Sequence, residues 1–521
     1  MKIFKNKKRK YITIISLVSV FIVIGLCITY YNSISKEEPL IGAYIDGTYS
    51  ETLPSKGKGY AVDKIVCDNN KNASWDYDKW GIKLSNWGTR SRCNIYFKSL
   101  ESFTIANKTF YLDEMQRCPG INNDGTVAVT GAEDTYGYLC KTKDDYGDSY
   151  YYRGNVTNNY VKFADKYWRI IRINGDGTVR VIYDGTSAHA NGESSEDRQI
   201  GTSAFNDCWK KDNVYEATDS DISYDNAGVG YMYGNRDAIV EATEYSSSTS
   251  FKNTSTYYIA KEYTYDVATD RFTLKDPIAV LGSAMTSDYV GYYTFGKTDA
   301  SYSSSDELMK IFSVTVGDSS ASANCGYVRY GTSSKEVAQT NTNDSTIKTY
   351  LDDWYKANIS GTENEQYLAD NIFCNDRSFA SNNSGTGAGV SETYYNWGDW
   401  HASKSTLKCP QQNDAFTVSD TTNGNGALTY PIGLITTNEA VLAGGWDAYN
   451  KGYYLYSGSW YWASSPIIFN GYFARVIYVN GSGYAYDNNY VSYPCGVRPV
   501  LNLSAEVLAK GIGTMNDPYH L

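Results

Sequence analysis

The segment from residue 11 to residue 31 constrains this chain most strongly. It holds 21 residues without a single charge, and residues 1–10 before it carry six basic residues and no acidic one. A helix rises about 1.5 Å per residue, so 21 residues extend roughly 31 Å, which matches the hydrocarbon core of a bilayer. The positive-inside rule then predicts a cytoplasmic basic segment at 1–10, a transmembrane helix at 11–31 and an extracellular remainder. The expected location is the cell membrane, as a single-pass protein.

A cleaved signal peptide is the alternative for this segment. Signal peptides have an apolar region of about 7–15 residues and a small-residue exit. Here the apolar run is longer and leaves through Thr29-Tyr30-Tyr31-Asn32, so cleavage near Ser33 is the weaker interpretation. Both interpretations predict that most of the chain is exported.

The composition describes the polar remainder. The chain holds 51 Tyr and 45 Gly but 10 Pro, and its net charge is −11. Tyr and Thr favour strands, while Gly, Asn and Ser favour tight turns, so many short strands are expected. An acidic surface repels phosphate backbones, which argues against nucleic acid as a partner. A chain of 521 residues is also too long for one core, so at least two domains are expected.

Nine of the ten cysteines lie beyond residue 36, where disulfides are permitted if the chain is exported. An odd number leaves at least one thiol unpaired. Pairing of neighbours in the sequence suggests three disulfides, although connectivity does not follow from sequence alone: Cys67–Cys93, Cys118–Cys140 and Cys374–Cys409.

Residues 37–105 read as a small all-β sandwich. Apolar residues alternate with polar ones around Ile65, Ile82 and Ile95, which indicates strands with one buried face. Tryptophans at 75, 80 and 87 can fill a thin core, and a disulfide would stabilise so small a module. We expect a stalk module here.

Residues 106–521 form the larger domain, and its clearest element is a hairpin at 160–185. Two apolar strands flank Asn174-Gly175-Asp176-Gly177, a strong turn signal. A calcium loop is the alternative, but the acidic ladder and closing Glu of an EF-hand are missing. Two helices are also expected, one with Asp344 or Ser345 as its N-cap and running to about residue 357, and one at 438–443 after an N-cap at Thr437. Residues 187–340 are expected to be an irregular insertion with several short strands, for example at 256–259 and 279–281, whose order does not follow from the sequence.

The C-terminal part resembles a known family. Residues 459–466 read SWYWASSP and residues 496–503 read GVRPVLNL, with a Tyr/Asn/Gly hairpin between them. This pattern resembles the C-type-lectin-like fold in the branch of formylglycine-generating-enzyme-like proteins. It is most similar to uncharacterised surface proteins of Gram-positive gut bacteria, which also carry segments like 160–178 and 430–445. The resemblance implies an α+β fold for residues 106–521.

The resemblance also implies roles for individual residues. Trp168, Trp460 and Trp462 would pack beneath a twisted sheet, and Arg498 would be buried on carbonyl groups as a structural residue. Tyr and Asn side chains suit sugar or protein ligands. The exposed C-terminal loops would then bind ligand through Phe469, Tyr472, Tyr484, Tyr486, Asn488, Asn489 and Tyr490.

These patterns favour an extracellular binding protein, an adhesin or a receptor for a glycan or protein. A cell-wall or glycan-active enzyme is the alternative, and a purely structural protein is a third. The three histidines lie in no recognisable catalytic motif, and Cys495 lacks the partner cysteine of formylglycine-generating enzymes. We therefore predict no catalytic residue, no cofactor and no metal site.

Overall fold

The computed structural model describes residues 40–521 with short gaps. The gaps are 57, 69–71, 77–78, 86–91, 113–117, 119–126, 129–136, 207–221, 246–256, 267–270, 275–289, 298–310, 316–323, 397–403 and 446–449. The chain divides into two compact units, one of residues 1–103 with 109–115 and the other of residues 104–108 with 116–521. Each unit has its own sheets and is described separately.

The first unit is built on a sheet in the order β2-β1-β6-β3. Its disulfide joins Cys67 and Cys93, which lie directly opposite each other on β3 and β6. Ile95 and Phe97 are buried, and Trp75 meets Phe97 edge to face. The strands of this region are β1 (Leu40–Ile45), β2 (Thr48–Ser50), β3 (Tyr60–Cys67), β4 (Asn72–Asp76), β5 (Gly81–Ser85), β6 (Arg92–Ser99), β7 (Ser102–Ile105) and β8 (Lys108–Tyr111).

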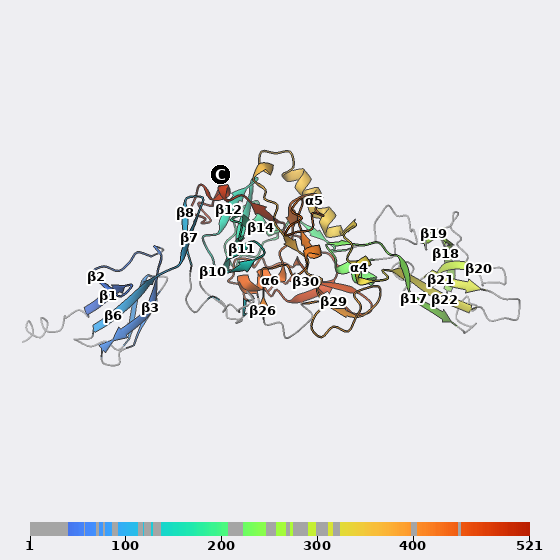
Figure 1. Cartoon of the computed structure of the whole chain (residues 1–521), viewed down its shortest axis with the longest axis horizontal. Helices are drawn as coiled ribbons and strands as arrows, with labels where there is room; N and C mark the ends of the chain where they lie inside the picture. Colours follow the sequence, from blue (N-terminus) through green and yellow to red (C-terminus); the bar gives the residue numbers. More distant parts are fainter. Residues whose placement is uncertain are drawn as a thin grey trace, which may run out of the picture. The chain divides into compact units, whose positions relative to one another are not determined.

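The second unit contains a sheet in the order β10-β11-β13-β14-β33-β28, with β12 paired to β13 (Figure 1). The predicted hairpin at 160–185 is confirmed, because β13 and β14 pair across the turn at 174–177. The C-terminal strand β33 pairs with β14, so distant parts of the chain share one sheet. Its strands are β10 (Gly137–Asp144), β11 (Gly147–Gly154), β12 (Tyr160–Phe163), β13 (Lys166–Ile173), β14 (Val179–Gly185), β28 (Ile432–Gly433) and β33 (Val500–Leu503).

A further sheet of this unit has the order β15-β32-β29-β30-β31, with β25 paired to β29. Tyr461 and Trp462 at the start of β29 are buried, so this strand carries part of the core. Its strands are β15 (Thr202–Ser203), β25 (Thr393–Tyr394), β29 (Tyr461–Phe469), β30 (Ala474–Val479), β31 (Asp487–Tyr490) and β32 (Cys495–Gly496).

The short strands expected within 187–340 can now be ordered; the one expected at 256–259 falls at the start of β18, and the one expected at 279–281 lies outside the described residues. Residues 238–331 form an antiparallel sheet in the order β17-β22-β21-β20-β18-β19. The strands are β17 (Ala238–Tyr245), β18 (Tyr257–Asp266), β19 (Arg271–Leu274), β20 (Val290–Lys297), β21 (Ile311–Thr315) and β22 (Asn324–Gly331). Tyr- and Thr-rich runs such as 257–266 have the β propensity that this pairing requires.

Helices are short in the described part of the chain. Helix α5 (Thr346–Asn358) begins after the N-cap Ser345, close to the predicted bounds. Helix α6 (Thr437–Ala440) begins one residue earlier than predicted, after Thr436, and continues into a π-turn at Val441–Gly445. Helix α4 (Lys335–Ala338) is a single turn. Short strand pairs complete the unit: β16 (Met232–Tyr233) with β23 (Asn343–Asp344), β24 (Phe373–Cys374) with β27 (Ala415–Phe416), and β9 (Val127–Ala128) with β26 (Lys404–Ser405).

The predicted α+β, lectin-like fold class is therefore wrong. Strands account for 39% of the structure and helices for 15%, so the protein is mainly β. The physical reason is local, because Tyr, Thr and Val with frequent Gly and Asn favour strands and turns over long helices.

The predicted membrane anchor also requires correction. Among the residues that the structure describes, none of the helices combines the length and the apolar character needed to cross a bilayer. The predicted single-pass location in the cell membrane, with its membrane contact through residues 11–31, is therefore not supported by the described structure and is not retained. Residues 1–10 and 11–31 themselves lie outside the described residues.

Candidate functional site

A polar cleft in the second unit is the strongest candidate site. Its empty space is about 470 Å³, including the part that opens to solvent. The cleft is lined by Asp144, Asp145, Tyr146, Arg172, Arg180, Asn371, Ile372, Cys374, Asp376, Thr406, Leu407, Lys408, Thr436, Asn438, Glu439 and Ser465.

Part of the lining is a buried ionic network centred on Glu439. Its Oε1 lies 2.6 Å from Nε of Arg180 and 3.1 Å from Nε of Arg172. Burial alone would raise the pKa of Glu439, but the two guanidinium groups, Arg180 first, outweigh it and lower that pKa. Its Oε2 accepts the backbone N–H of Thr436 at 3.0 Å, in the capping box of α6. The start of α6 is therefore tied to strands β13 and β14.

Asp144 also lines the cleft, and its carboxylate connects two turns of the chain. Its carboxylate pairs with Arg172 and accepts the N–H groups of Tyr146 at 2.8 Å and Gly175 at 2.9 Å. A side chain at Gly175 would collide with the backbone N of Gly147, 2.4 Å from the Cβ position. The turn after β10 is thereby packed against the turn after β13, which fixes the place of Asp145.

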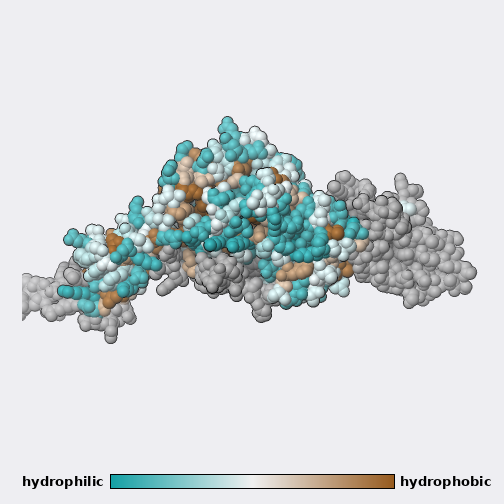
Figure 2. Space-filling view, viewed as in Figure 1, coloured by the Kyte–Doolittle hydropathy of each residue, from teal (hydrophilic) through white to brown (hydrophobic). Residues whose placement is uncertain are grey.

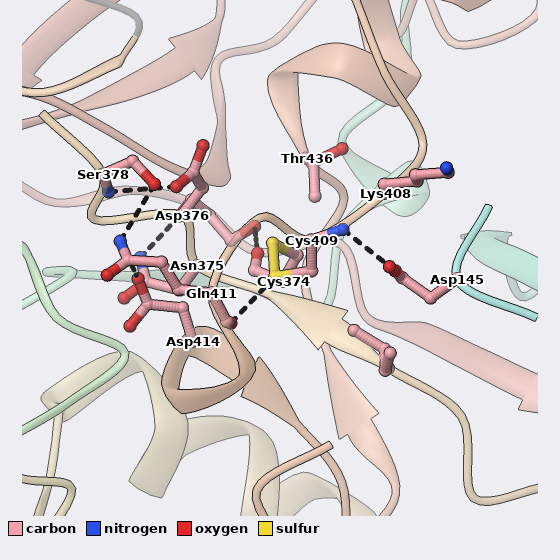
Figure 3. The surroundings of a disulfide bond; sticks show 12 residues. Asp145, Cys374, Asn375, Asp376, Ser378, Lys408, Cys409, Gln411, Asp414 and Thr436 are labelled. Atoms are coloured by element: carbon pink, nitrogen blue, oxygen red, sulfur yellow. Dashed lines mark hydrogen bonds between the residues drawn. A yellow bond between two sulfur atoms is a disulfide. The ribbon is translucent and has the colours of Figure 1, made fainter. Parts of the chain in front are cut away.

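The wall of the cleft contains the Cys374–Cys409 disulfide (Figure 3). The backbone N–H of Cys409 donates to Oδ2 of Asp145 at 2.9 Å. Burial raises the pKa of Asp145, and this hydrogen bond offsets only part of the rise. In Figure 3 Asp376 lies on the other side of the disulfide, and its carboxylate accepts from the N–H of Ser378 and the amide of Asn396, each at 3.0 Å.

Two amide side chains at the cleft have unused hydrogen-bonding atoms. Asn438 is 9% exposed, and its amide bonds to none of the residues that the structure describes. Asn371 is 1% exposed and donates to Asp176, but its Oδ1 has no donor within the described residues. Buried polar atoms are almost always hydrogen-bonded, so the unpaired Oδ1 of Asn371 beside the cleft indicates a missing partner.

The residues predicted to bind ligand do not form one site. Tyr472 is 69% exposed and lies near Tyr490, whereas Tyr484 lies at the opposite end of the β30–β31 hairpin. Phe469 and Tyr486 are buried, so neither is presented to a ligand. Asn489 lies on β31 and accepts from the N–H of the residue that follows it.

Arg475 organises the exposed end of that hairpin. Its guanidinium group lies 4.5 Å from the ring centre of Tyr490 and donates to the hydroxyl of that residue at 3.1 Å. It also donates to Oδ1 of Asn488 at 3.3 Å. Figure 2 shows a mainly hydrophilic face with small, separate hydrophobic patches. Because Arg475 contacts both the ring and the hydroxyl group of Tyr490, this aromatic side chain already has a partner within the protein.

The four residues that were predicted to have structural roles differ in their burial. Trp168 and Trp462 are fully buried. Arg498 is buried and donates to the carbonyl groups of Tyr183 at 3.0 Å and Leu455 at 2.8 Å. Trp460 does not pack beneath the sheet, because it is 48% exposed and stacks on Tyr478.

The disulfides match the three pairs that sequence proximity suggests. Cys67 is bonded to Cys93, Cys118 to Cys140 and Cys374 to Cys409, while Cys495 is a buried free thiol. Within the described part of the chain, no group of three or more His, Cys, Asp or Glu side chains is arranged to hold a metal ion.

Sequence reasoning missed the cleft. Its residues come from chain segments that are far apart, and the available signals were indirect. One was a charged residue inside each apolar strand, Arg172 on β13 and Arg180 on β14. Another was the paired aspartates at the end of β10.

Comparisons with protein-family models, curated proteins and solved structures find no match for this chain. The resemblance to formylglycine-generating-enzyme-like surface proteins therefore stays a prediction. The fold and the site by themselves define a class, a mainly-β protein with a disulfide-walled polar cleft.

Proposed function

We propose that this chain is a carbohydrate-binding protein and that the cleft beside the Cys374–Cys409 disulfide is its binding site. The observation that carries the proposal is the Asn438 amide, which is nine-tenths buried and unpaired among the described residues. A sugar hydroxyl can accept from its N–H groups and donate to its oxygen. The binding role inferred from sequence is retained, but its site moves from the hairpin loops to the cleft.

The neighbouring groups suit the same ligand. Asp145 and Asp376 offer carboxylate oxygens, which make strong hydrogen bonds to hydroxyl groups. The Ser465 hydroxyl oxygen accepts from the N–H of Thr437 at 3.0 Å, and Tyr146 adds a ring at the edge. The Arg172–Glu439–Arg180 network is preorganised and needs no rearrangement. An apolar ligand would leave these polar groups unsatisfied.

The test is a glycan array with the purified full chain, followed by calorimetric titration of the best glycan. Asn438→Ala removes a side chain without an intramolecular bond in the described structure, so the fold should persist. We expect its affinity to fall at least about tenfold, the loss typical of a buried hydrogen-bonding group.

Tyr472→Ala is the matched comparison for the hairpin surface. It should leave the affinity unchanged, because Tyr472 does not line the cleft. Loss of binding in Tyr472→Ala with normal binding in Asn438→Ala would return the site to the hairpin. Binding to no glycan would overturn the proposal, and hydrolysis of a bound oligosaccharide would indicate a glycan-active enzyme instead.

A further inference from the structure

We infer that the ligand of this cleft carries a positively charged amine, as a deacetylated amino sugar does. The inference rests on the proposed carbohydrate-binding function and specifies its ligand class.

The first step is the charge balance of the lining. Asp144 and Glu439 are neutralised by Arg172 and Arg180 in ion pairs. Asp145 and Asp376 differ, because within the described residues they accept only from neutral N–H groups and form no ion pair, although the charges of Arg172 and Lys408 act to lower the pKa of Asp145. Two carboxylates of the lining are therefore outside any ion pair in the described structure.

The second step is the acidic surroundings of Tyr146, which lines the cleft and donates to Asp420 at 3.1 Å. Burial first, and then the charges of Asp420, Asp176 and Asp370, raise the pKa of the Tyr146 hydroxyl. In the described structure these three aspartates also accept only from uncharged groups. They add negative potential behind one wall of the cleft.

The third step is the shortage of cations. Among the described lining residues, Lys408 is the one cation outside an ion pair, and it is exposed at the rim. A negatively charged sugar would meet two carboxylates outside ion pairs and one exposed ammonium. A cationic ligand would instead be attracted, and one cation would leave the site close to neutral.

The fourth step is the match to an ammonium group, which donates three hydrogen bonds and accepts none. An unused buried acceptor at the cleft is the amide oxygen of Asn371. The second oxygen of the Asp145 carboxylate is also unused among the described residues, since the bond from Cys409 takes Oδ2. These carboxylates form no described cluster suited to a metal ion, so an organic cation fits the donor set better.

The experiment compares three soluble trisaccharides by calorimetric titration of the full chain at about pH 6, where a sugar amine is protonated. The probes are a trimer of glucosamine, its fully N-acetylated form and a trimer of a uronic acid. We expect the amine trimer to bind at least about tenfold more tightly than the acetylated one, and the uronic acid to bind weakest. Added salt should reduce the difference.

Two variants locate the effect. Asp145→Asn keeps an oxygen for the Cys409 N–H and removes the charge, so the preference for the amine should fall about tenfold. Asp376→Asn is the second variant and should act in the same direction. Asp353→Asn removes the same charge from an exposed site on α5 and should leave the preference intact. Circular dichroism confirms that each variant is folded.

The outcomes separate the two proposals. Equal affinity for the amine and acetylated trimers would overturn the amine inference and leave carbohydrate binding standing. Binding to none of these or other glycans would overturn both. An amine preference that survives in both Asp145→Asn and Asp376→Asn would show that these carboxylates do not recognise the amine. Binding that requires added calcium would overturn the inference in favour of a metal-bridged ligand.

Discussion

Arginine side chains occupy several of the most buried positions in the second unit. The fully buried ones are Arg153, Arg169, Arg180, Arg198, Arg377 and Arg498. Each meets carbonyl oxygens or a buried acid, as when Arg377 donates to Asp414 and to the carbonyl group of Met232. A guanidinium group carries five donors in a fixed fork, so one side chain can join several strands and loops. Short irregular segments are held together in this way without long helices.

Glu439 is the residue whose loss should cost the most stability near the cleft. Glu439→Gln leaves Arg172 and Arg180 without their shared carboxylate, so we expect a loss of about 3 kcal/mol in the free energy of unfolding. Urea unfolding measures this loss. The exposed Asp353→Asn should change it by less than about 0.5 kcal/mol. Equal unfolding midpoints for Glu439→Gln and the unaltered chain would contradict the prediction.

Glu439 also makes the free energy of unfolding depend on pH. The pKa of Glu439 is lowered in the folded state, so its contribution is complete above the unfolded pKa and is lost as the pH falls through the folded pKa. Acid unfolding should accordingly be less steep in Glu439→Gln.

Asp145 should titrate at a higher pH than Glu439, because burial raises its pKa. The ionised carboxylate is the form that binds a hydroxyl or an ammonium group. We therefore expect glycan affinity to fall on acidification, starting above the ordinary aspartate range, while the fold is still intact. Calorimetric titration across the acid range tests this. Asp145→Asn should bind more weakly and lose this dependence, and an unchanged profile in that variant would contradict the assignment.

At the scale of elements, strand β31 lies at the edge of its sheet in a form that resists further pairing. The N–H of Asn488 donates to the side chain of Asp487 at 3.0 Å, and the N–H of Tyr490 donates to the side chain of Asn489 at 2.9 Å. Donors engaged by side chains are not available to a strand of another molecule.

Removing these side chains should expose the edge. We expect the double substitution Asp487→Ala with Asn489→Ala to cause concentration-dependent self-association, measured by light scattering after size exclusion. Asn488→Ala is the control in the same strand, because its side chain bonds to Arg475 rather than to a backbone N–H. Self-association of the control to the same degree would contradict the mechanism.

Elements with local signals could be predicted, and elements without them could not. The turn at 174–177 and the N-cap Ser345 are local, so the β13–β14 hairpin and α5 were predicted close to their observed bounds. The strand order of the sheet within 238–331 could not be predicted, because its strands pair across connections that carry no local turn signal such as the one at 174–177. Trp460 was misplaced because β29, which is buried almost throughout, begins one residue later, at Tyr461.

At the scale of the whole molecule, the two units have separate cores. The first unit has few buried apolar side chains in the described part, centred on Ala43, Ile95 and Phe97. The Cys67–Cys93 bond closes a loop with a sequence separation of 26, which contributes about 3.5 kcal/mol in the loop-entropy model. A core this small depends on such a crosslink.

Replacing both of these cysteines with serine should therefore unfold the first unit and leave the second intact. Calorimetry should show an early transition lost or shifted to lower temperature, while glycan binding at the cleft persists. The same exchange at Cys374 and Cys409 is the comparison, because it loosens the cleft wall and should reduce binding. Loss of binding in the first variant would show that the two units are coupled.

Features that depend on residues adjacent in the sequence could be predicted: a strand-rich polar chain, the hairpin turn at 174–177 and the helix after Ser345. Tertiary structure alone decided where charge is buried and which polar atoms lack partners. Asp145, Asn371 and Asn438 meet at one cleft because β10, the segment before β24 and α6 are brought together by the Arg172–Glu439–Arg180 network. Burial and ion pairing arise from contacts across hundreds of residues, and no periodicity along the chain encodes them.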